Sequence, residues 1–270
     1  MPAHDTAFAG SIPRLYESHF VPLIFECYAR DLARRVAAAR PARVLEVAAG
    51  TGVVTRALAA TLPAGTRLVA TDLNPAMLDH AATLPIARAV EWRQADALAL
   101  PFDDAAFDAV VCQFGAMFFP DKARAFAEAR RVLAPGGRFF FNVWDRIEDN
   151  EFADVITGAL KLHFPKDPPL FLARTPYGYH DVATIRSDLV KGGFTKDIHV
   201  HTVAARSVAD SARVPAIGFC QGSPLRMEIE ARDATGLEQA TDVAAEAVER
   251  KFGAGRVHAK IQAHVVSAER

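Results

Sequence analysis

Val44-Leu45-Glu46-Val47-Ala48-Ala49-Gly50-Thr51-Gly52 is the stretch that decides the fold of this 270-residue chain. Val44 to Val47 is a mostly apolar run, as in a buried strand of a parallel sheet. A turn of small residues follows it, and a helical pattern begins near Val53. Small residues let a ligand approach the backbone, and the helix start offers free N–H groups with partial positive charge. Alone, Gly50-x-Gly52 is a weak indication of nucleotide binding, because such turns also occur in folds that bind nothing.

A second apolar run, Leu68 to Ala70, leads to Asp72, which follows Gly52 by about 20 residues, the spacing of a ribose-binding acid. A carboxylate at this position can reach both ribose hydroxyls of an adenosine ligand. The alternative is that Asp72 only caps the next helix, where Asn74 is also a candidate cap and Pro75 the first residue. We favour ligand binding, because the acid has the spacing that the ligand requires.

Composition limits the class of protein. The chain is 51% hydrophobic and 23% charged, which is enough for one sizeable core. Its net charge is −1 and no basic stripe is present, so we expect no nucleic-acid partner. The three cysteines, Cys27, Cys112 and Cys220, have no metal or disulfide spacing, as suits a reducing cytoplasm. We expect a cytoplasmic protein, because no secretion signal is visible and the run 107–119 is too short to span a bilayer.

Strands and helices alternate through the first half of the chain, which predicts an α/β fold with a doubly wound, mostly parallel sheet and right-handed crossovers. Capping residues, proline and glycine set the expected limits of the helices. After the fifth strand, the patterns predict two more helices and a closing pair of strands. The expected strands are 43–47, 67–72, 90–93, 107–112, 138–144, 197–204 and 257–265, and the expected helices are 20–39, 52–61, 75–82, 121–133, 181–191 and 241–251.

Five motifs occur in the order seen in class I S-adenosylmethionine-dependent methyltransferases, which the chain resembles over about residues 43–144. They are Leu45-Glu46-Val47-Ala48-Ala49-Gly50-Thr51-Gly52, Asp72, Ala95-Asp96-Ala97, Phe107-Asp108-Ala109-Val110-Val111 and Leu133-Ala134-Pro135-Gly136-Gly137. The resemblance is closest to the branch of quinone-biosynthesis and other small-molecule methyltransferases. It implies a Rossmann-like methyltransferase sheet with an antiparallel C-terminal strand. One departure is Ala48, where the family has its first motif glycine; we expect a slightly tighter contact there and a retained site.

The resemblance also implies cofactor-binding roles for residues at the carboxyl ends of the strands. The turn from Ala48 to Gly52 would lie under the methionine end of S-adenosylmethionine, with Glu46 near its amino group. Asp72 would bind the ribose hydroxyls and Asp96 the adenine amino group. The full expected set is Glu46, Ala48, Ala49, Gly50, Gly52, Asp72, Leu73, Met77, Asp96, Ala97, Gln113 and Phe114.

We interpret residues 1–270 as a single methyltransferase domain. Its core comprises about 40–144, 181–204 and 256–268, and lid segments comprise about 1–39, 145–180 and 205–255. The lid and the end of the fourth strand are rich in Phe, which favours a small, largely apolar or aromatic acceptor; ordinary core packing is the alternative. The candidate substrate-binding residues are Tyr16, Phe20, Met117, Phe118, Trp144 and Phe219.

The sequence identifies no convincing catalytic base and no metal site. His163 and His180 fall in the lid, and His199-x-His201 has no third ligand at a readable spacing. Two other functions stay open at this stage. An NAD-dependent oxidoreductase would share the start of the fold, although Thr55 stands where a third turn glycine belongs. A non-catalytic S-adenosylmethionine-binding protein would keep the same pocket. The methyl acceptor, the methylated atom and the oligomeric state cannot be read from the sequence.

Overall fold

A computed structural model describes residue 10 and residues 12–270, and these divide into two compact units. The sheet unit comprises 26–143, 179–203 and 263–270. The helical unit comprises the described residues through Phe25 together with 144–178 and 204–262. The organisation as a single domain with lid segments stays a prediction. Residues 1–9 and 11 of the expected lid segment 1–39 lie outside the described residues.

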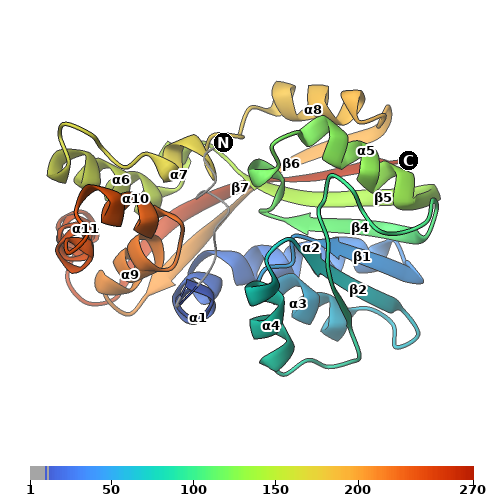
Figure 1. Ribbon diagram of the computed structural model, residues 1–270, viewed down its shortest axis with the longest axis horizontal. Coiled ribbons are helices and arrows are strands. Elements are labelled where there is room, and N and C mark those ends of the chain that lie inside the picture. The colour runs from blue at the N-terminus through green and yellow to red at the C-terminus, as the bar shows by residue number, and fades with distance from the viewer. Residues whose placement is uncertain (1–9, 11) are drawn as a thin grey trace. The chain divides into compact units, whose positions relative to one another are not determined.

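The sheet has seven strands in the described residues, in the order β3-β2-β1-β4-β5-β7-β6 (Figure 1). The pairs β1–β2, β2–β3, β1–β4 and β4–β5 are parallel, and the C-terminal strands supply the antiparallel part of the sheet. The mostly parallel sheet with an antiparallel C-terminal strand is therefore confirmed. The strands are β1 (Arg43–Val47), β2 (Arg67–Asp72), β3 (Glu91–Gln94), β4 (Phe107–Gln113), β5 (Leu133–Trp144), β6 (Lys196–Ala209) and β7 (Val257–Glu269).

Helices cover both faces of the sheet within the sheet unit. On one face, Leu32 and Leu58 pack with Val111 and Phe140 in a buried cluster. On the other face, the Phe126 ring packs at a tilt against Phe139 and Phe141, so helices cover both faces as in a doubly wound sheet. The helices of this unit are α2 (Glu26–Ala38), α3 (Val53–Thr61), α4 (Pro75–Thr83), η3 (Ala116–Phe118), α5 (Lys122–Val132) and α8 (Val182–Lys191).

The helical unit packs α11 (Leu237–Phe252) against α6 (Glu151–His163) and α9 (Arg213–Gln221). Ala240, Ala244 and Val248 form the buried stripe of α11, at the spacing of one helix face. The remaining helices of this unit are α1 (Ile12–Leu15), η2 (Tyr16–Phe25), η4 (Ile147–Asp149), α7 (Phe171–Arg174) and α10 (Leu225–Arg232). In the described residues, no helix has both the length and the apolar composition needed to cross a membrane.

Several predicted limits are wrong, for physical reasons. The helix expected from residue 20 is a π-helix, η2, as far as Phe25, and α2 starts only at Glu26. Pro22 lies inside η2, and a proline cannot donate the N–H that an α-helix requires there. Strand β5 begins at Leu133, before the expected Arg138. Asn74 occupies the N-cap position of α4, but its side chain makes no capping hydrogen bond.

Candidate functional site

The loop between β1 and α3, residues 48–52 (the glycine loop), has three residues in the left-handed region. Their φ angles are 55° at Ala48, 56° at Gly50 and 79° at Gly52. Glycine adopts this region without steric cost, whereas alanine is strained there. A Cβ on Gly52 would also lie 3.0 Å from the ring of Trp92. Gly50 and Gly52 are thus required by the path of the chain, and Ala48 keeps that path at a cost in strain.

Asp72, at the end of β2, is 7% exposed and holds the glycine loop in place. Its Oδ2 accepts a hydrogen bond from the Gly50 main-chain N–H at 2.8 Å, and its Oδ1 accepts one from the Asn74 N–H at 2.8 Å. Burial raises the pKa of this carboxyl, and the two N–H donors oppose that rise. An ionised carboxylate accepts hydrogen bonds on both oxygens, so this group is of the kind that can bind a diol.

Glu46 lies on β1 beneath the loop and is 1% exposed. Its Oε2 accepts a hydrogen bond from the Thr55 hydroxyl at 2.6 Å. Burial raises its pKa to about 8, despite that hydrogen bond. Glu46 is therefore largely protonated at neutral pH in the free protein. A cation placed beside it would favour the ionised form.

The Thr51 hydroxyl is buried and has no hydrogen-bond partner within the described structure. It lies in the glycine loop, just before α3, whose first turn has no side-chain cap. A buried hydroxyl without a partner is uncommon, because the lost hydration is not replaced. The bent loop, the free hydroxyl and the uncapped helix start together fit a polar ligand such as the methionine end of S-adenosylmethionine.

The residues expected to contact adenine follow β2 and β3 in the chain, and Met77 lies in α4. Met77 is 3% exposed, and its Cε would be 3.5 Å from a Cβ on Gly50. Leu73 is 51% exposed, so its side chain presents apolar surface to solvent. Asp96 is exposed and accepts from the Leu98 N–H at 2.9 Å, while Ala97 is buried. The fold therefore brings Gly50 of the glycine loop, Asp72 and Met77 together at the carboxyl ends of the strands.

The end of β4 holds Gln113 and Phe114, which were expected near the methyl group. The Gln113 amide oxygen accepts from Asn142 on β5 at 3.2 Å, and both residues are buried. Phe114 has φ 50°, a strained conformation for a bulky residue. Its ring packs edge-on against Tyr28, with centroids 5.5 Å apart. The sequence reasoning missed Asn142 and Tyr28, which only the strand register and the helix packing bring to the end of β4.

The candidate substrate residues divide between the two units. Met117 and Phe118 belong to η3 in the sheet unit, with Met117 buried and Phe118 partly buried. Tyr16, Phe20, Trp144 and Phe219 belong to the helical unit, where they form one aromatic cluster with Phe25. Phe20 meets Phe219 edge-on at 4.7 Å. Phe25 had not been singled out in the sequence, because its spacing is equally that of core packing.

The histidines do not assemble into a metal site in the part of the chain that is described. No group of three potential ligands occurs there. His199 and His201 stack on the exposed edge strand β6, with ring centroids 6.4 Å apart.

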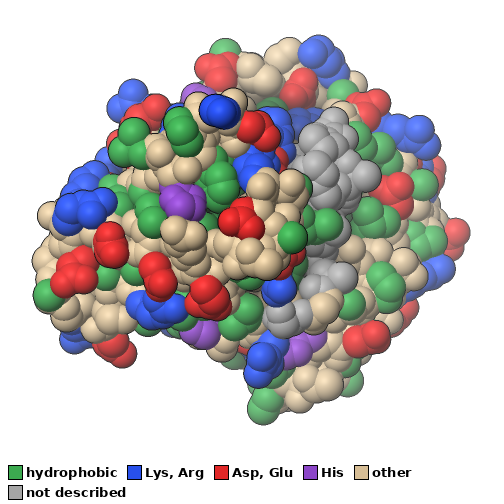
Figure 2. Space-filling view, turned by 60° about the vertical axis from the view of Figure 1, so that its left-hand side comes forward, with side chains coloured by type: hydrophobic (Ala, Val, Ile, Leu, Met, Phe, Trp, Pro, Cys, Tyr) green, Lys and Arg blue, Asp and Glu red, His purple; other side chains and the backbone are tan. Residues whose placement is uncertain are grey.

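Figure 2 shows acidic and basic side chains interspersed over the face that it presents. None of the three cysteines forms a disulfide in the described part of the chain.

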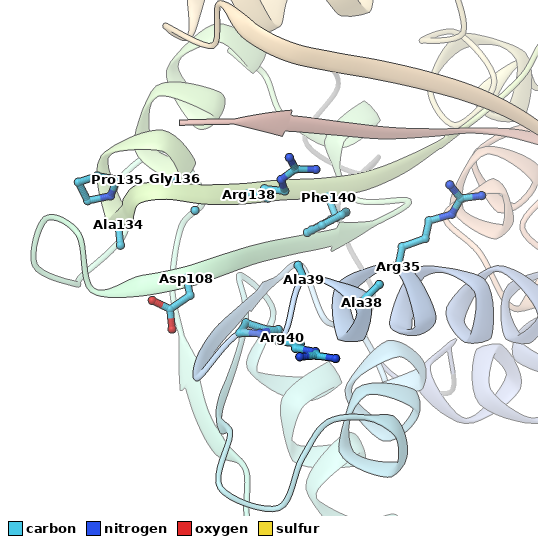
Figure 3. Close-up of a pocket in the computed structure, with 12 residues that line it drawn as sticks. Arg35, Ala38, Ala39, Arg40, Asp108, Ala134, Pro135, Gly136, Arg138 and Phe140 are labelled. Atoms are coloured by element: carbon cyan, nitrogen blue, oxygen red, sulfur yellow. The ribbon is translucent and has the colours of Figure 1, made fainter.

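A groove of about 480 Å³ opens near the amino ends of β4 and β5 (Figure 3). It is lined by Arg35 and Arg40 from the end of α2 and the turn after it, and by Asp108, Arg138 and Phe140 from the strands. None of the candidate site residues lines it. Ligands of open α/β sheets bind beyond the carboxyl ends of the strands, so the glycine loop is the candidate site.

Known proteins resemble the chain most clearly over the sheet that carries this loop. Residues 45–141 match the methyltransferase domain family. A demethylmenaquinone methyltransferase of Thermus thermophilus is 48% identical over 100 residues, covering 36% of this chain and 45% of that protein. The ubiquinone/menaquinone biosynthesis C-methyltransferase UbiE of Zymomonas mobilis is 36% identical over 139 residues, covering 50% and 51% of the two chains.

The chain thus spans about half the length of the curated relatives that it matches. Among solved structures, the phosphoethanolamine N-methyltransferase 2 of Haemonchus contortus, crystallised with S-adenosylhomocysteine, matches with a TM-score of 0.58. Its sequence identity is 18%, over 96% of this chain and 56% of that chain, so it supports the fold alone. The motif order, the topology of the sheet and the family match all indicate a methyltransferase domain. Residues 45–141 therefore match the methyltransferase domain family, the outcome that the resemblance in the sequence implied.

Proposed function

We propose that this chain transfers a methyl group from S-adenosylmethionine to a small, largely apolar or aromatic metabolite. The observation that carries the proposal is the group of residues at the carboxyl ends of β1, β2 and β4. There the left-handed glycine loop, the Asp72 carboxylate that holds it and the buried Glu46 lie together. The two curated relatives described above are methyltransferases by name.

In this proposal, each residue of this group has one task. Asp72 accepts hydrogen bonds from the ribose hydroxyls while it holds Gly50. Glu46 faces the amino group, and the Thr51 hydroxyl gains the partner that it lacks in the free protein. Leu73 and Met77 pack on adenine, with Asp96 and Ala97 at its amino group. Gln113 and Phe114 border the methyl group.

S-adenosylmethionine supplies an already activated methyl group, so the protein has to align the donor and the acceptor for an in-line displacement. A base is needed only when the acceptor atom carries a proton at neutral pH. The aromatic cluster in the helical unit and the residues of η3 favour an aromatic acceptor with few polar groups. A quinone-like ring fits this description, and the names of the two relatives point to the same class.

Thr55 argues against a dinucleotide-dependent oxidoreductase. At the position of the third glycine of the dinucleotide motif, this chain has a buried threonine that hydrogen-bonds Glu46. A glycine is used there for close helix–strand packing. Titration with NADH and with S-adenosylhomocysteine separates the two functions, and we expect binding of the second alone.

The test of the whole proposal is transfer of a labelled methyl group. The purified chain is incubated with labelled S-adenosylmethionine and, separately, a small-molecule extract, tRNA and total protein, with Asp72→Ala as the control. We expect label in the small-molecule pool only. Label confined to tRNA or protein would overturn the acceptor class, and binding without any transfer would indicate a non-catalytic cofactor-binding protein.

A further inference from the structure

Gly115, the residue before η3, has a backbone conformation that does not require glycine. Its φ and ψ are −100° and −34°, which any L-residue adopts. The preceding Phe114 is the residue in the left-handed region, at φ 50°. The turn after β4 therefore has a bulky residue where glycine would be favoured, and a glycine where it is not needed for conformation. A steric reason has to account for Gly115.

That reason lies chiefly in the glycine loop, which follows the neighbouring strand β1. A Cβ added to Gly115 would lie 2.5 Å from the Cβ of Ala48 and 2.8 Å from the Sγ of Cys112. Real Cβ atoms essentially never approach so closely, so a neighbour would have to shift. The Cys112 sulfur ends a rotatable side chain and can turn away. The Ala48 methyl is fixed to the backbone and can move only with the glycine loop.

We infer that Gly115 is a positioning residue for cofactor binding: it leaves the space that the Ala48 methyl occupies and so fixes the start of the glycine loop. The inference rests on the proposed function, in which this loop binds S-adenosylmethionine. Ala48 is itself in a strained conformation, so an added side chain at residue 115 would shift a loop that already carries strain. The two positions are coupled across β1 and β4, which are paired in the sheet.

The test is a double-mutant cycle on Ala48 and Gly115, read by calorimetric titration with S-adenosylhomocysteine. We expect Gly115→Ala to weaken binding about tenfold or more, since residues in contact couple strongly. Ala48→Gly alone should change the affinity by about threefold or less, and the double variant Ala48→Gly/Gly115→Ala should recover most of the loss.

Two control variants separate positioning from general destabilisation. Gly65→Ala makes the same substitution in the same unit, where an added Cβ meets nothing within 4 Å. Phe194→Leu lowers stability at a fully buried site that stacks on Phe139, away from the loop. Both controls should keep the wild-type affinity. Thermal unfolding of every variant shows that binding is measured on folded protein.

The outcomes decide the inference in each case. Unchanged affinity in Gly115→Ala, or additive effects in the cycle, would overturn it while the proposed function stands. If Gly115→Ala does not fold and the double variant folds, the coupling is supported; failure of both to fold contradicts it. A wild-type chain that binds no S-adenosylhomocysteine would refute the proposed function and the cofactor role of Gly115 together. In that case, changes in melting temperature that add up in the double variant would separately contradict the steric coupling of Ala48 and Gly115.

Discussion

The main-chain N–H of Gly50 donates to Oδ2 of Asp72 at 2.8 Å, so the acid at the end of β2 holds the loop at the end of β1. The sequence indicates Asp72 as a ligand for ribose or as a helix cap, and these alternatives do not include this contact. The carboxylate receives Asn74 N–H on its other oxygen. One side chain thereby fixes the glycine loop and the start of α4, the two segments between which adenosine would lie in the proposed complex.

Asp72→Ala should weaken binding of both S-adenosylmethionine and S-adenosylhomocysteine. The lost charge-assisted hydrogen bonds are worth about 1.5–3 kcal/mol, and release of Gly50 adds to that loss. Calorimetric titration measures the effect, with Asp103→Ala as the control, because Asp103 is an exposed acid in another loop. Equal affinities in the two variants would remove Asp72 from the site.

Thr51→Val should separate folding from binding. The Thr51 hydroxyl is buried without a partner in the described structure, so replacing it with a methyl removes an unpaired polar group. We expect the free protein to gain about 1 kcal/mol of unfolding free energy, while the affinity for S-adenosylhomocysteine falls. Chemical denaturation and calorimetry are run on the same samples. A loss of stability with unchanged affinity would show that the hydroxyl serves the fold and not the ligand.

Glu46 should make stability and binding depend on pH in opposite directions. Its pKa rises from 4.5 to about 8 on folding, so the folded chain holds a proton that the unfolded chain releases. The free energy of unfolding should therefore fall as pH rises from about 4.5 to about 8, by up to about 1.4 kcal/mol per pH unit from this group. Glu46→Gln, which cannot ionise, should flatten that part of the profile in denaturation measured across the range.

The affinity for the cofactor should depend on pH in the opposite direction and rise with pH. A ligand ammonium beside Glu46 favours the ionised carboxylate, so the affinity for S-adenosylhomocysteine should rise between pH 5.5 and 7, by up to about tenfold per pH unit. Below pH 7 the ligand's amino group stays protonated, so the change has to come from the protein. The variant Glu46→Gln should bind with a flat profile. A wild-type affinity that is independent of pH would place the ligand's amino group elsewhere.

Local patterns predicted the sheet because each parallel strand is a short apolar run with a turn or helix signal after it. Asp72 could be predicted because its role depends on spacing along the chain. Gly115 could not, since its requirement arises from a contact between the turns after β1 and β4, where its Cα lies beside the Ala48 methyl. Asn142 meets Gln113 because of the register of β4 beside β5. The sequence did not predict that η2 is a π-helix. Its apolar residues keep the spacing of an α-helix, while Pro22 changes the backbone hydrogen bonds.

Phe219→Leu should lower methyl transfer without changing cofactor affinity. Phe219 is 2% exposed and meets Phe20 edge-on at 4.7 Å in the helical unit. If these rings line the acceptor pocket, the smaller side chain should reduce label incorporation into the small-molecule pool by about tenfold, the usual cost of a poorer apolar fit. Affinity for S-adenosylhomocysteine should stay unchanged, because none of the residues proposed to bind the cofactor belongs to this cluster.

Phe252→Leu is the matched control for that change. Phe252 lies in the same unit, where it packs edge-on against Phe152 at 5.1 Å, and it is not a candidate substrate residue. Each leucine variant should cost about 1 kcal/mol of stability, which thermal unfolding verifies. Equal transfer rates in the two variants would assign Phe219 to ordinary core packing. A drop confined to Phe219→Leu, at equal stability and equal cofactor affinity, would assign the aromatic cluster to acceptor binding.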